Sequence, residues 1–244
     1  MIINIYLSSF MKIIPIGTKV FQEGEDIIRF ITAHVRHLKE CSVLVVTSKI
    51  VALAECRTAI IENDQTKERL IRAESELALP TKYCWLTVKD GIVMASAGID
   101  ESNGNGKLIL LPKDSFRSAG FLRRVLRHKY RIGRLGVVIT DSRTMPLRTG
   151  VTAVAVGYAG LRGIRDYRGT PDIFGRKLRI SQTNVADSIA TAAVLVMGEG
   201  NEQRPLAVIE DAPVEFRDKV RRNELRIELE DDMYRPFFDQ LPRK

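Results

Sequence analysis

The stretch Gly136-Val137-Val138-Ile139-Thr140-Asp141 has the pattern of a buried strand that ends on a carboxylate. β-Branched side chains favour strands, and a short continuous apolar run is typical of a strand covered on both faces. A second run of this kind, Val43-Leu44-Val45-Val46, leads into Thr47-Ser48-Lys49. The two runs predict a sheet core whose strand ends carry polar side chains.

Further periodic segments extend this core along the chain. We expect strands at 13–16 and 206–209, a hairpin at 84–95, and helices at 26–38, 64–79, 114–130 and 184–198. Asn184 followed by Asp187 resembles a helix-capping arrangement, which gives Asp187 a local structural role. The polar segment from Asp100 to Lys107 contains two glycines and is expected to be a loop, the first candidate for a site.

Composition places the chain among ordinary globular proteins. Its 244 residues include 38 Lys and Arg against 30 Asp and Glu, and the formal charge of +8 favours anionic partners such as phosphates, nucleotides or nucleic acid. Three cysteines match no zinc signature or disulfide framework, so we expect a cytoplasmic protein with Cys56 and Cys84 buried. No apolar run reaches the roughly 18 residues of a membrane span. Met1 to Phe10 lack the features of a signal peptide, and we expect the domain to begin at Met11.

Two acidic segments each follow an apolar stretch: Asp100-Glu101-Ser102-Asn103 and Thr140-Asp141-Ser142. Hard divalent cations take carboxylate and neutral oxygen ligands, and Mg²⁺ or Mn²⁺ commonly bridges a protein carboxylate to nucleotide phosphates. The two segments are a candidate metal site, although Asp and Asn are also ordinary turn formers. Cationic side chains that could neutralise the remaining phosphate charge are Arg143, Arg148, Arg165, Arg168 and Arg176.

Several common site types are disfavoured. The chain has no G-x-x-x-x-G-K-S/T loop and no G-x-G-x-x-G after a strand, so a standard NTPase or Rossmann dehydrogenase does not fit. His34 and His37 precede Cys41 without a second cluster of ligands, which argues against a metal site there. With only His128 remaining, a Ser-His-Asp hydrolase is also disfavoured.

The expected helix at 114–130 carries a basic face. Its cationic residues are Arg117, Arg123, Arg124, Arg127 and Lys129. We interpret this stripe as a solvated helix face, because no aromatic residues interleave with the arginines as they do in platforms for single-stranded nucleic acid. Nucleic-acid binding by this helix is the alternative interpretation.

Five segments, taken in order, resemble the coenzyme F420-0:γ-glutamyl ligase family: SVLVVTSKIVALAECR, ASAGIDESNGNG, LGVVITDSRTMPLRTGVTAVAVGYAGL, DYRGTPDIFGRKLRIS and ADSIATAAVLVMGE. The resemblance covers about Ile13 to Glu210. It implies an α+β fold with mixed and antiparallel sheets, packed helices and two interlocked subdomains, over a domain at 11–212. Residues 213–244 then form a charged C-terminal extension, expected to be helical and packed on the domain or on a dimer partner.

The resemblance further implies a GTP-dependent amide ligase that uses Mg²⁺ or Mn²⁺ to join L-glutamate to F420-0. In such a reaction the acceptor carboxylate takes the γ-phosphoryl group of GTP, and the amine of glutamate then displaces phosphate. Family members form homodimers with their sites near the subunit contact. We therefore expect a homodimer that binds a nucleotide, L-glutamate and a carboxylated acceptor such as F420-0, without a membrane or nucleic-acid partner.

Site residues follow from the same resemblance. Asp100 and Asp141 match the ligands of the first metal, and Ser142 stands where the family has a metal-binding threonine. Glu199 is the best match for a further metal ligand, with Glu202 in reserve.

Catalytic and nucleotide-binding residues are implied in the same way. The expected catalytic residues are Asp100, Asp141 and Arg148. Contacts to the nucleotide are implied for Gly17, Ser48, Lys49 and Asn103.

Two segments depart from the family pattern. The family usually reads SKAEGR where this chain has ALAECR at 52–57, so a lysine expected to contact the nucleotide is replaced by Leu53. The family's SDTFGRPWR is replaced by TDSRTMPLR at 140–148, which keeps the aspartate and the final arginine but loses the glycine and the tryptophan. Two alternatives therefore stay open. Beside the F420-0 ligase, these are a ligase of this fold acting on another acid, and a non-catalytic protein that binds a nucleotide or nucleic acid.

Overall fold

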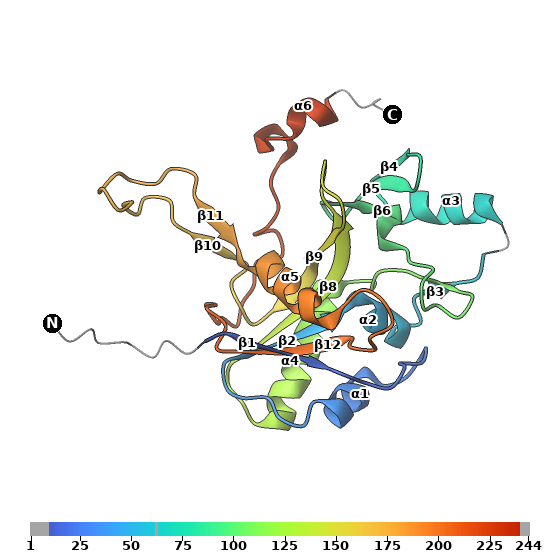
Figure 1. Cartoon of the computed structure of the whole chain (residues 1–244), viewed down its shortest axis with the longest axis horizontal. Coiled ribbons are helices and arrows are strands. Elements are labelled where there is room, and N and C mark those ends of the chain that lie inside the picture. Colours follow the sequence, from blue (N-terminus) through green and yellow to red (C-terminus); the bar gives the residue numbers. More distant parts are fainter. Residues whose placement is uncertain (1–9, 62, 240–244) are drawn as a thin grey trace.

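The computed structural model describes residues 10–61 and 63–239. Its largest element is a five-stranded sheet in the order β1-β12-β2-β8-β9 (Figure 1). The strands are β1 (Lys12–Ile16), β12 (Leu206–Glu210), β2 (Ser42–Thr47), β8 (Leu135–Thr144) and β9 (Val151–Ala159). Neighbouring strands are antiparallel except for β2 and β8, which are parallel. This mixed sheet and its packed helices confirm the predicted α+β fold class.

The parallel pair brings the two polar strand ends together. β2 and β8 pair without interruption from Ser42 opposite Leu135 to Thr47 opposite Thr140. Residues that follow Thr47 therefore lie at the same edge of the sheet as residues that follow Thr140. β8 runs past the end expected from the sequence, because its last residues pair with β9, and Asp141 lies within the strand.

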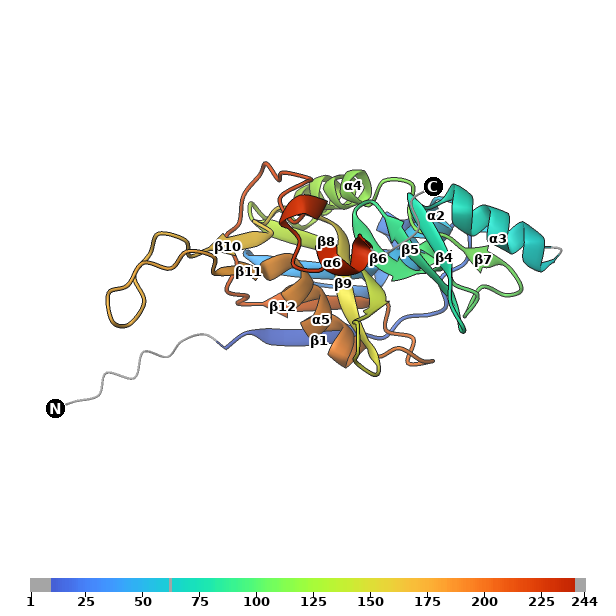
Figure 2. The same ribbon diagram turned by 90° about the horizontal axis from the view of Figure 1, so that it is seen from above.

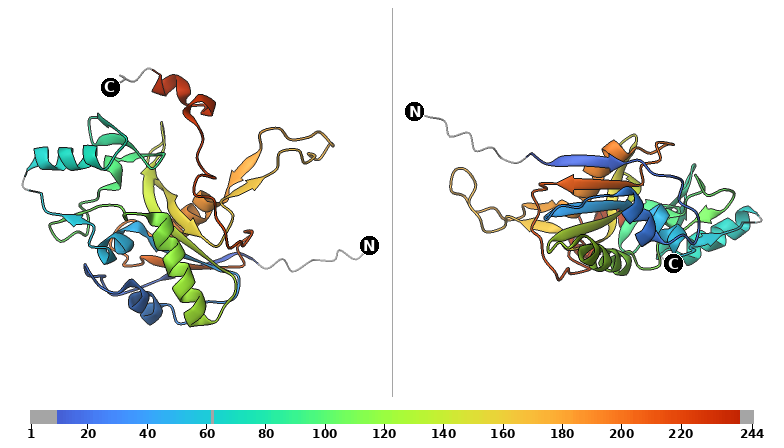
Figure 3. Two further views of the ribbon diagram at one scale, coloured as in Figure 1. Left: turned by 180° about the vertical axis from the view of Figure 1, so that it is seen from behind. Right: turned by 90° about the horizontal axis from the view of Figure 1, so that it is seen from below.

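Helices cover both faces of the sheet (Figure 3). One face is covered by α1 (Ile27–His34), α2 (Ser48–Ala54) and α4 (Ser115–Tyr130), and the opposite face by α5 (Val185–Met197). Leu44 and Val46 belong to the first core, whereas Val43 and Val45 belong to the second. Alternating side chains of one strand thus enter two cores, which explains why β2 is apolar from Val43 to Val46.

Local capping explains where several helices begin. Asp114 caps α4 and accepts a hydrogen bond from the backbone N–H of Arg117 at 2.9 Å. Asn184 caps α5 and accepts from the N–H of Asp187 at 3.0 Å, the capping arrangement expected from the sequence. α1 ends at His34, earlier than the hydrophobic pattern predicts.

A smaller antiparallel sheet lies beside the main one (Figure 2). It consists of β4 (Leu77–Pro80), β5 (Trp85–Lys89) and β6 (Ile92–Ala95), preceded by α3 (Asp64–Ala73). The β5–β6 hairpin turns at Asp90 and Gly91, both with positive φ, as expected from the sequence. The helix predicted at 64–79 is wrong beyond Ala73, because residues 77–80 form a ladder with β5 instead of continuing α3.

Three short elements connect these layers, and one hairpin projects from them. The connecting elements are β3 (Thr58–Ala59), β7 (Leu108–Ile109) and the 3₁₀ turn η1 (Ser96–Gly98). The hairpin consists of β10 (Ile164–Asp166) and β11 (Gln182–Asn184), which extend away from the body of the molecule in Figure 1.

The C-terminal extension is mostly non-helical, which corrects the sequence-based expectation. Helical turns occur only at η2 (Leu229–Asp231) and α6 (Arg235–Phe238) within the described part of the extension, residues 213–239. Val214, Phe216 and Leu225 pack instead against the core beneath α5. The extension lacks the long apolar repeat of a helix and is held by individual anchors.

The cysteine prediction is wrong in part. Cys56 and Cys84 are both exposed, since each lies in a turn, after α2 and before β5 respectively. Within the residues described, no helix is long and apolar enough to cross a membrane. The prediction about Met1 to Phe10 falls almost entirely on residues 1–9, which lie outside the described part of the chain.

Candidate functional site

The candidate site begins where β2 passes into α2. Ser48 and Lys49 are the first two residues of α2. The Ser48 side chain is buried, and its hydroxyl donates a hydrogen bond to Oδ1 of Asp141 at 2.8 Å. The contact follows from the parallel pairing, which places the start of α2 beside β8.

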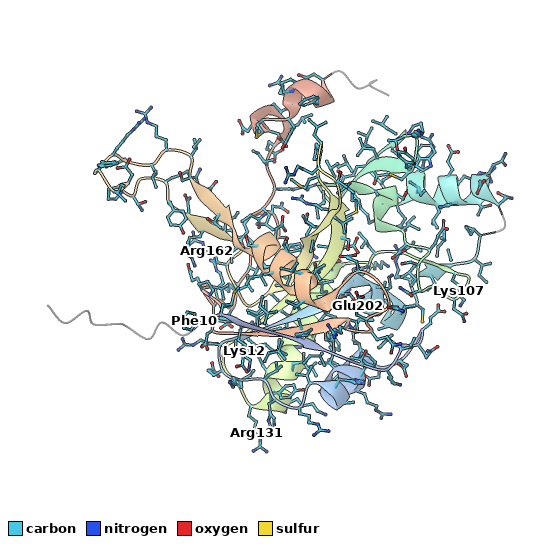
Figure 4. The ribbon with its side chains drawn as sticks, viewed as in Figure 1. Phe10, Lys12, Lys107, Arg131, Arg162 and Glu202 are labelled. Atoms are coloured by element: carbon cyan, nitrogen blue, oxygen red, sulfur yellow. The ribbon has the colours of Figure 1, made fainter. Side chains whose placement is uncertain are left out.

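Lys49 holds the acidic loop against the same helix. Its Nζ lies 2.6 Å from Oδ2 of Asp100 and donates to the hydroxyl of Ser102 at 3.0 Å. Ser102 in turn donates to Asp100 through its N–H at 2.7 Å and its hydroxyl at 2.9 Å. Lys107, which is labelled in Figure 4, lies at the far end of the loop and forms a 2.5 Å ion pair with Glu23. The loop is thus anchored at both ends.

The structure therefore brings Asp100 and Asp141 to consecutive residues of one helix. Burial raises the pKa of Asp141 to about 6; the hydrogen bond from Ser48 opposes this shift, and the negative charge of Asp100 adds to it. Burial alone would raise the pKa of Asp100 as well, but Lys49 and Ser102 together outweigh it and lower that pKa. The charge of Asp100 influences the pKa of Asp141, and of the two carboxylates only Asp100 forms an ion pair within the described part of the chain.

Ser142 and Glu199 form a second pair next to the first. The Ser142 hydroxyl lies 2.8 Å from both carboxylate oxygens of Glu199, which follows α5. Successive side chains of a strand point to opposite faces, so Ser142 and Asp141 face different sides of β8. Glu202 lies in the loop after α5 (Figure 4) and accepts from the N–H of Gly200 at 2.8 Å. Glu202 therefore shapes this loop.

The predicted metal ligands do not form a metal site made of protein side chains alone, but they fit a site that is completed by a substrate. Across residues 10–61 and 63–239, no three His, Cys, Asp or Glu side chains gather closely enough to hold a metal ion by themselves. Mg²⁺, however, is usually bound through one or two carboxylates together with substrate phosphates and water. Asp100 and Asp141 fit this second mode, in which a nucleotide completes the site.

The other predicted residues lie apart from these contacts. Gly17 is exposed after β1, and nothing lies within 4 Å of where its Cβ would be. Asn103 is exposed in the acidic loop with a φ of 58°, and Arg148 is exposed in the loop between β8 and β9. Leu53, which replaces the lysine expected there, packs against the core between α2 and the sheet.

Ser102 is a site residue that sequence reasoning did not single out. It connects Asp100 and Lys49, and the signal for it is local. In an Asx turn, the side chain of an Asp accepts a hydrogen bond from the backbone N–H of the residue two positions later. The Asp100-Glu101-Ser102 spacing could therefore have indicated a turn that closes on its own carboxylate.

Comparison with known protein families shows which family this chain belongs to. The family model described as F420-0:Gamma-glutamyl ligase matches residues 15–211, which include every site residue discussed above. The chain belongs to this family. The predicted resemblance is thereby confirmed, and the extension after residue 211 lies outside the part that the F420-0:γ-glutamyl ligase model matches.

Individual relatives within the ligase family agree with this assignment. The chain is 35% identical over 216 residues to coenzyme F420:L-glutamate ligase of Methanopyrus kandleri, covering 80% of this chain and 84% of that protein. It is 33% identical over 218 residues to the protein of the same name from Archaeoglobus fulgidus, covering 82% and 87%. With the Methanococcus maripaludis C7 protein of that name it shares 38% identity over 147 residues, only 60% of this chain and 58% of the relative.

Proposed function

We propose that this protein is a ligase that adds L-glutamate to coenzyme F420-0 or to a related carboxylated acceptor, with GTP as co-substrate and Mg²⁺ or Mn²⁺ as cofactor. The names of the relatives support the glutamate-adding reaction. The single observation that carries the proposal is the pairing of Ser48 with Asp141 and of Lys49 with Asp100, within the matched segment.

The proposed reaction has two steps. An oxygen of the acceptor carboxylate attacks the γ-phosphorus of GTP, the bond to the β–γ bridging oxygen breaks, and GDP leaves. The amine of glutamate then attacks the acyl carbon, phosphate leaves with the bonding electrons, and the amine proton passes to solvent. The product is an amide, and atoms and charge balance.

The chain's own residues would act by holding and orienting charge. Asp100 and Asp141 would hold the metal ion, which when bound supplies positive charge to the transferring phosphoryl group. Ser48 keeps Asp141 oriented, and Ser102 keeps Asp100 oriented, because each donates a hydrogen bond to the carboxylate beside it. Lys49 is paired with Asp100 here and is available to a phosphate when a metal neutralises that carboxylate.

Product analysis tests the reaction directly. The protein is incubated with F420-0, L-glutamate, GTP and Mn²⁺, and mass spectrometry looks for an acceptor heavier by one glutamyl residue with stoichiometric GDP. Asp141→Asn should abolish the product while the protein stays folded, and Asp231→Asn, at an exposed position in η2, should retain it. Parallel reactions with ATP and with other carboxylic acids separate the F420 ligase from the divergent-ligase alternative. A wild type that forms no amide and binds no nucleotide would refute the proposal.

Nucleic-acid binding by α4 is the weaker candidate. A groove of about 1490 Å³ runs along α4 and is lined by several of its arginines. Asp218 from the C-terminal extension pairs with Arg123 at 2.6 Å and with Arg127 at 3.1 Å, and Glu55 also lines the groove. Internal acids therefore neutralise part of the basic stripe, which argues against nucleic-acid binding by α4. Loss of a gel shift with rising salt would identify a phosphate-binding groove.

We also propose that the protein is a homodimer, as the family resemblance implies. Analytical ultracentrifugation at several protein concentrations tests this state directly. A sedimenting species with the mass of a single chain, throughout the range used for activity, would contradict it.

A further inference from the structure

Among the residues that the structure describes, Arg143 is an arginine that forms no ion pair. It lies on β8, opposite Thr152 of β9, and its side chain is partly buried. Its Nε is buried and has no hydrogen-bond partner within residues 10–61 and 63–239. A guanidinium carries five N–H donors and is always charged, and buried donors are normally satisfied. The Nε of Arg143 is therefore a donor that the described side chains and backbone leave available.

Asp187, an acid that the charge of Arg143 influences, already accepts hydrogen bonds from other groups. Burial raises the pKa of Asp187, and the positive charge of Arg143 is among the effects that partly offset this. Both Asp187 oxygens nevertheless accept other hydrogen bonds, Oδ1 from the N–H of Ala155 at 2.9 Å and Oδ2 from the amide of Asn184 at 2.8 Å. Asp187 serves the start of α5 and the backbone of β9, and it does not satisfy the guanidinium.

Arg143 also lies close to the candidate site. The register from Asp141 opposite Val154 to Arg143 opposite Thr152 is uninterrupted, so both residues face the same side of β8. Their Cα atoms are about 7 Å apart, since a strand rises about 3.3 Å per residue. An arginine side chain spans a similar length, so one substrate molecule can reach both groups.

The charges of the candidate site leave room for a further cation such as Arg143. Asp100 and Asp141 are both acidic, and Lys49 is paired with Asp100. The lysine that the family pattern places at position 53 is absent, and Arg143 stands where the family segment SDTFGRPWR has phenylalanine. Compared with that pattern, this chain lacks a cation on α2, and in the second segment it has an arginine at position 143 instead of at position 145, where it has Met145.

We propose that Arg143, and not the exposed Arg148, binds an anionic oxygen group of a substrate, either a phosphate of the nucleotide or a carboxylate. This inference rests on the proposed function for the identity of those substrates. The planar fork of the guanidinium matches either group through two parallel N–H···O bonds. The unsatisfied Nε is one of the donors in that fork.

Arg143→Leu and Arg143→Lys test the proposal, with Arg29→Leu at an exposed position of α1 as the matched control. Isothermal titration measures the Kd for GDP with Mn²⁺ and the Kd for L-glutamate, and steady-state assays give the KM for each substrate. In Arg143→Leu, one Kd or KM should rise about 10- to 100-fold, as expected for loss of a charged hydrogen bond, while the others change less than about twofold. A change for GDP identifies phosphate, and a change for L-glutamate or the acceptor identifies a carboxylate. Lysine should restore part of the affinity, because it keeps the charge without the fork.

Stability separates a binding role from a structural one. Because the structure shows no hydrogen bond to the unpartnered Nε, Arg143→Leu should melt at or above the temperature of the wild type. Unchanged affinities in Arg143→Leu would overturn the proposal, and a lower melting temperature beside them would show that the role of Arg143 is structural.

The two proposals fail in different ways. If the wild type makes amide and Arg143→Leu behaves identically in every assay, only the Arg143 proposal fails. If the wild type makes no amide but Arg143→Leu loses GDP or glutamate binding, only the ligase proposal fails. A wild type that binds none of these probes overturns both.

Discussion

The Ser48 hydroxyl donates a 2.8 Å hydrogen bond to Asp141 across 93 residues of sequence, and the next residue, Lys49, lies 2.6 Å from Asp100. One helix start thus determines the position of two carboxylates from distant segments. A small shift of α2 would move both acids together, which couples the geometry of the site to the packing of a single buried helix.

The buried carboxylate of Asp141 should make stability depend on pH. Its pKa is about 6 in the folded protein, against an ordinary value of 3.8, so the native state holds an extra proton between these values. Stability should therefore fall as pH rises from about 4 to 6 and then level off, with a total of about 3 kcal/mol from a shift of this size. Asp141→Asn cannot titrate and should lack this slope in thermal melts with EDTA. Identical slopes for the two proteins would contradict the prediction.

Replacing Ser48 should move that pH dependence. Ser48→Ala removes the hydrogen bond that lowers the pKa of Asp141. In each background, Ser48 and Ser48→Ala, the stability of the protein with Asp141 is compared with that of its Asp141→Asn variant as the pH changes. The pH midpoint of this difference in stability should be higher in the Ser48→Ala background. Ser188→Ala, at an exposed hydroxyl on α5, serves as control and should leave the midpoint in place. A midpoint unmoved by Ser48→Ala would show that the hydrogen bond has little effect on the charged form.

Glu74, the residue that follows α3, should matter more for stability than a glutamate within that helix. Burial alone would raise its pKa, but Lys89 and Arg57, both at 2.8 Å, lower it instead. Glu74→Gln should cost about 1–3 kcal/mol in urea unfolding at pH 7, because two half-buried cations lose their partner. Since the folded pKa is depressed, this contribution should be present above the unfolded pKa and disappear as pH falls through the folded value.

Glu68 provides the control for this prediction. It forms an exposed pair with Arg72 one turn away on α3. Glu68→Gln should change the free energy of unfolding by less than about 0.5 kcal/mol. Equal losses for Glu68→Gln and Glu74→Gln would contradict the argument from burial.

Glu224 should anchor the C-terminal extension. It accepts hydrogen bonds from the hydroxyl of Tyr158 at 2.7 Å and from the N–H of Gly163 at 2.6 Å. Glu224→Ala should destabilise the protein by about 2–3 kcal/mol, because a buried hydroxyl and a backbone N–H lose their acceptor. Glu215→Ala, which removes an exposed pair with Arg162, should change stability by less than about 1 kcal/mol in the same denaturation assay. Comparable effects would mean that the extension has no specific anchor.

The elements that were predicted correctly have signals contained in a few neighbouring residues. The start of α4 at Asp114 and of α5 at Asn184 follow from capping side chains, and the turn at Asp90-Gly91 follows from two residues that tolerate positive φ. The error at 64–79 has the opposite origin. Residues 77–80 satisfy their backbone groups by pairing with β5, and hydrophobic spacing within the segment contains no information about that partner.

The sequence alone determined the apolar strands, the helix caps, the acidic segments around Asp100 and Asp141, and the family resemblance, because each depends on residue types at short spacing. Only the tertiary structure decided that Ser48 and Lys49 hold those aspartates, that Ser142 faces Glu199, and that Arg143 carries an unpartnered donor while Arg148 is exposed. The physical reason is that these contacts depend on which strands pair, in which direction and in which register. The parallel alignment of β2 with β8 is a property of the whole sheet and is not contained in either strand.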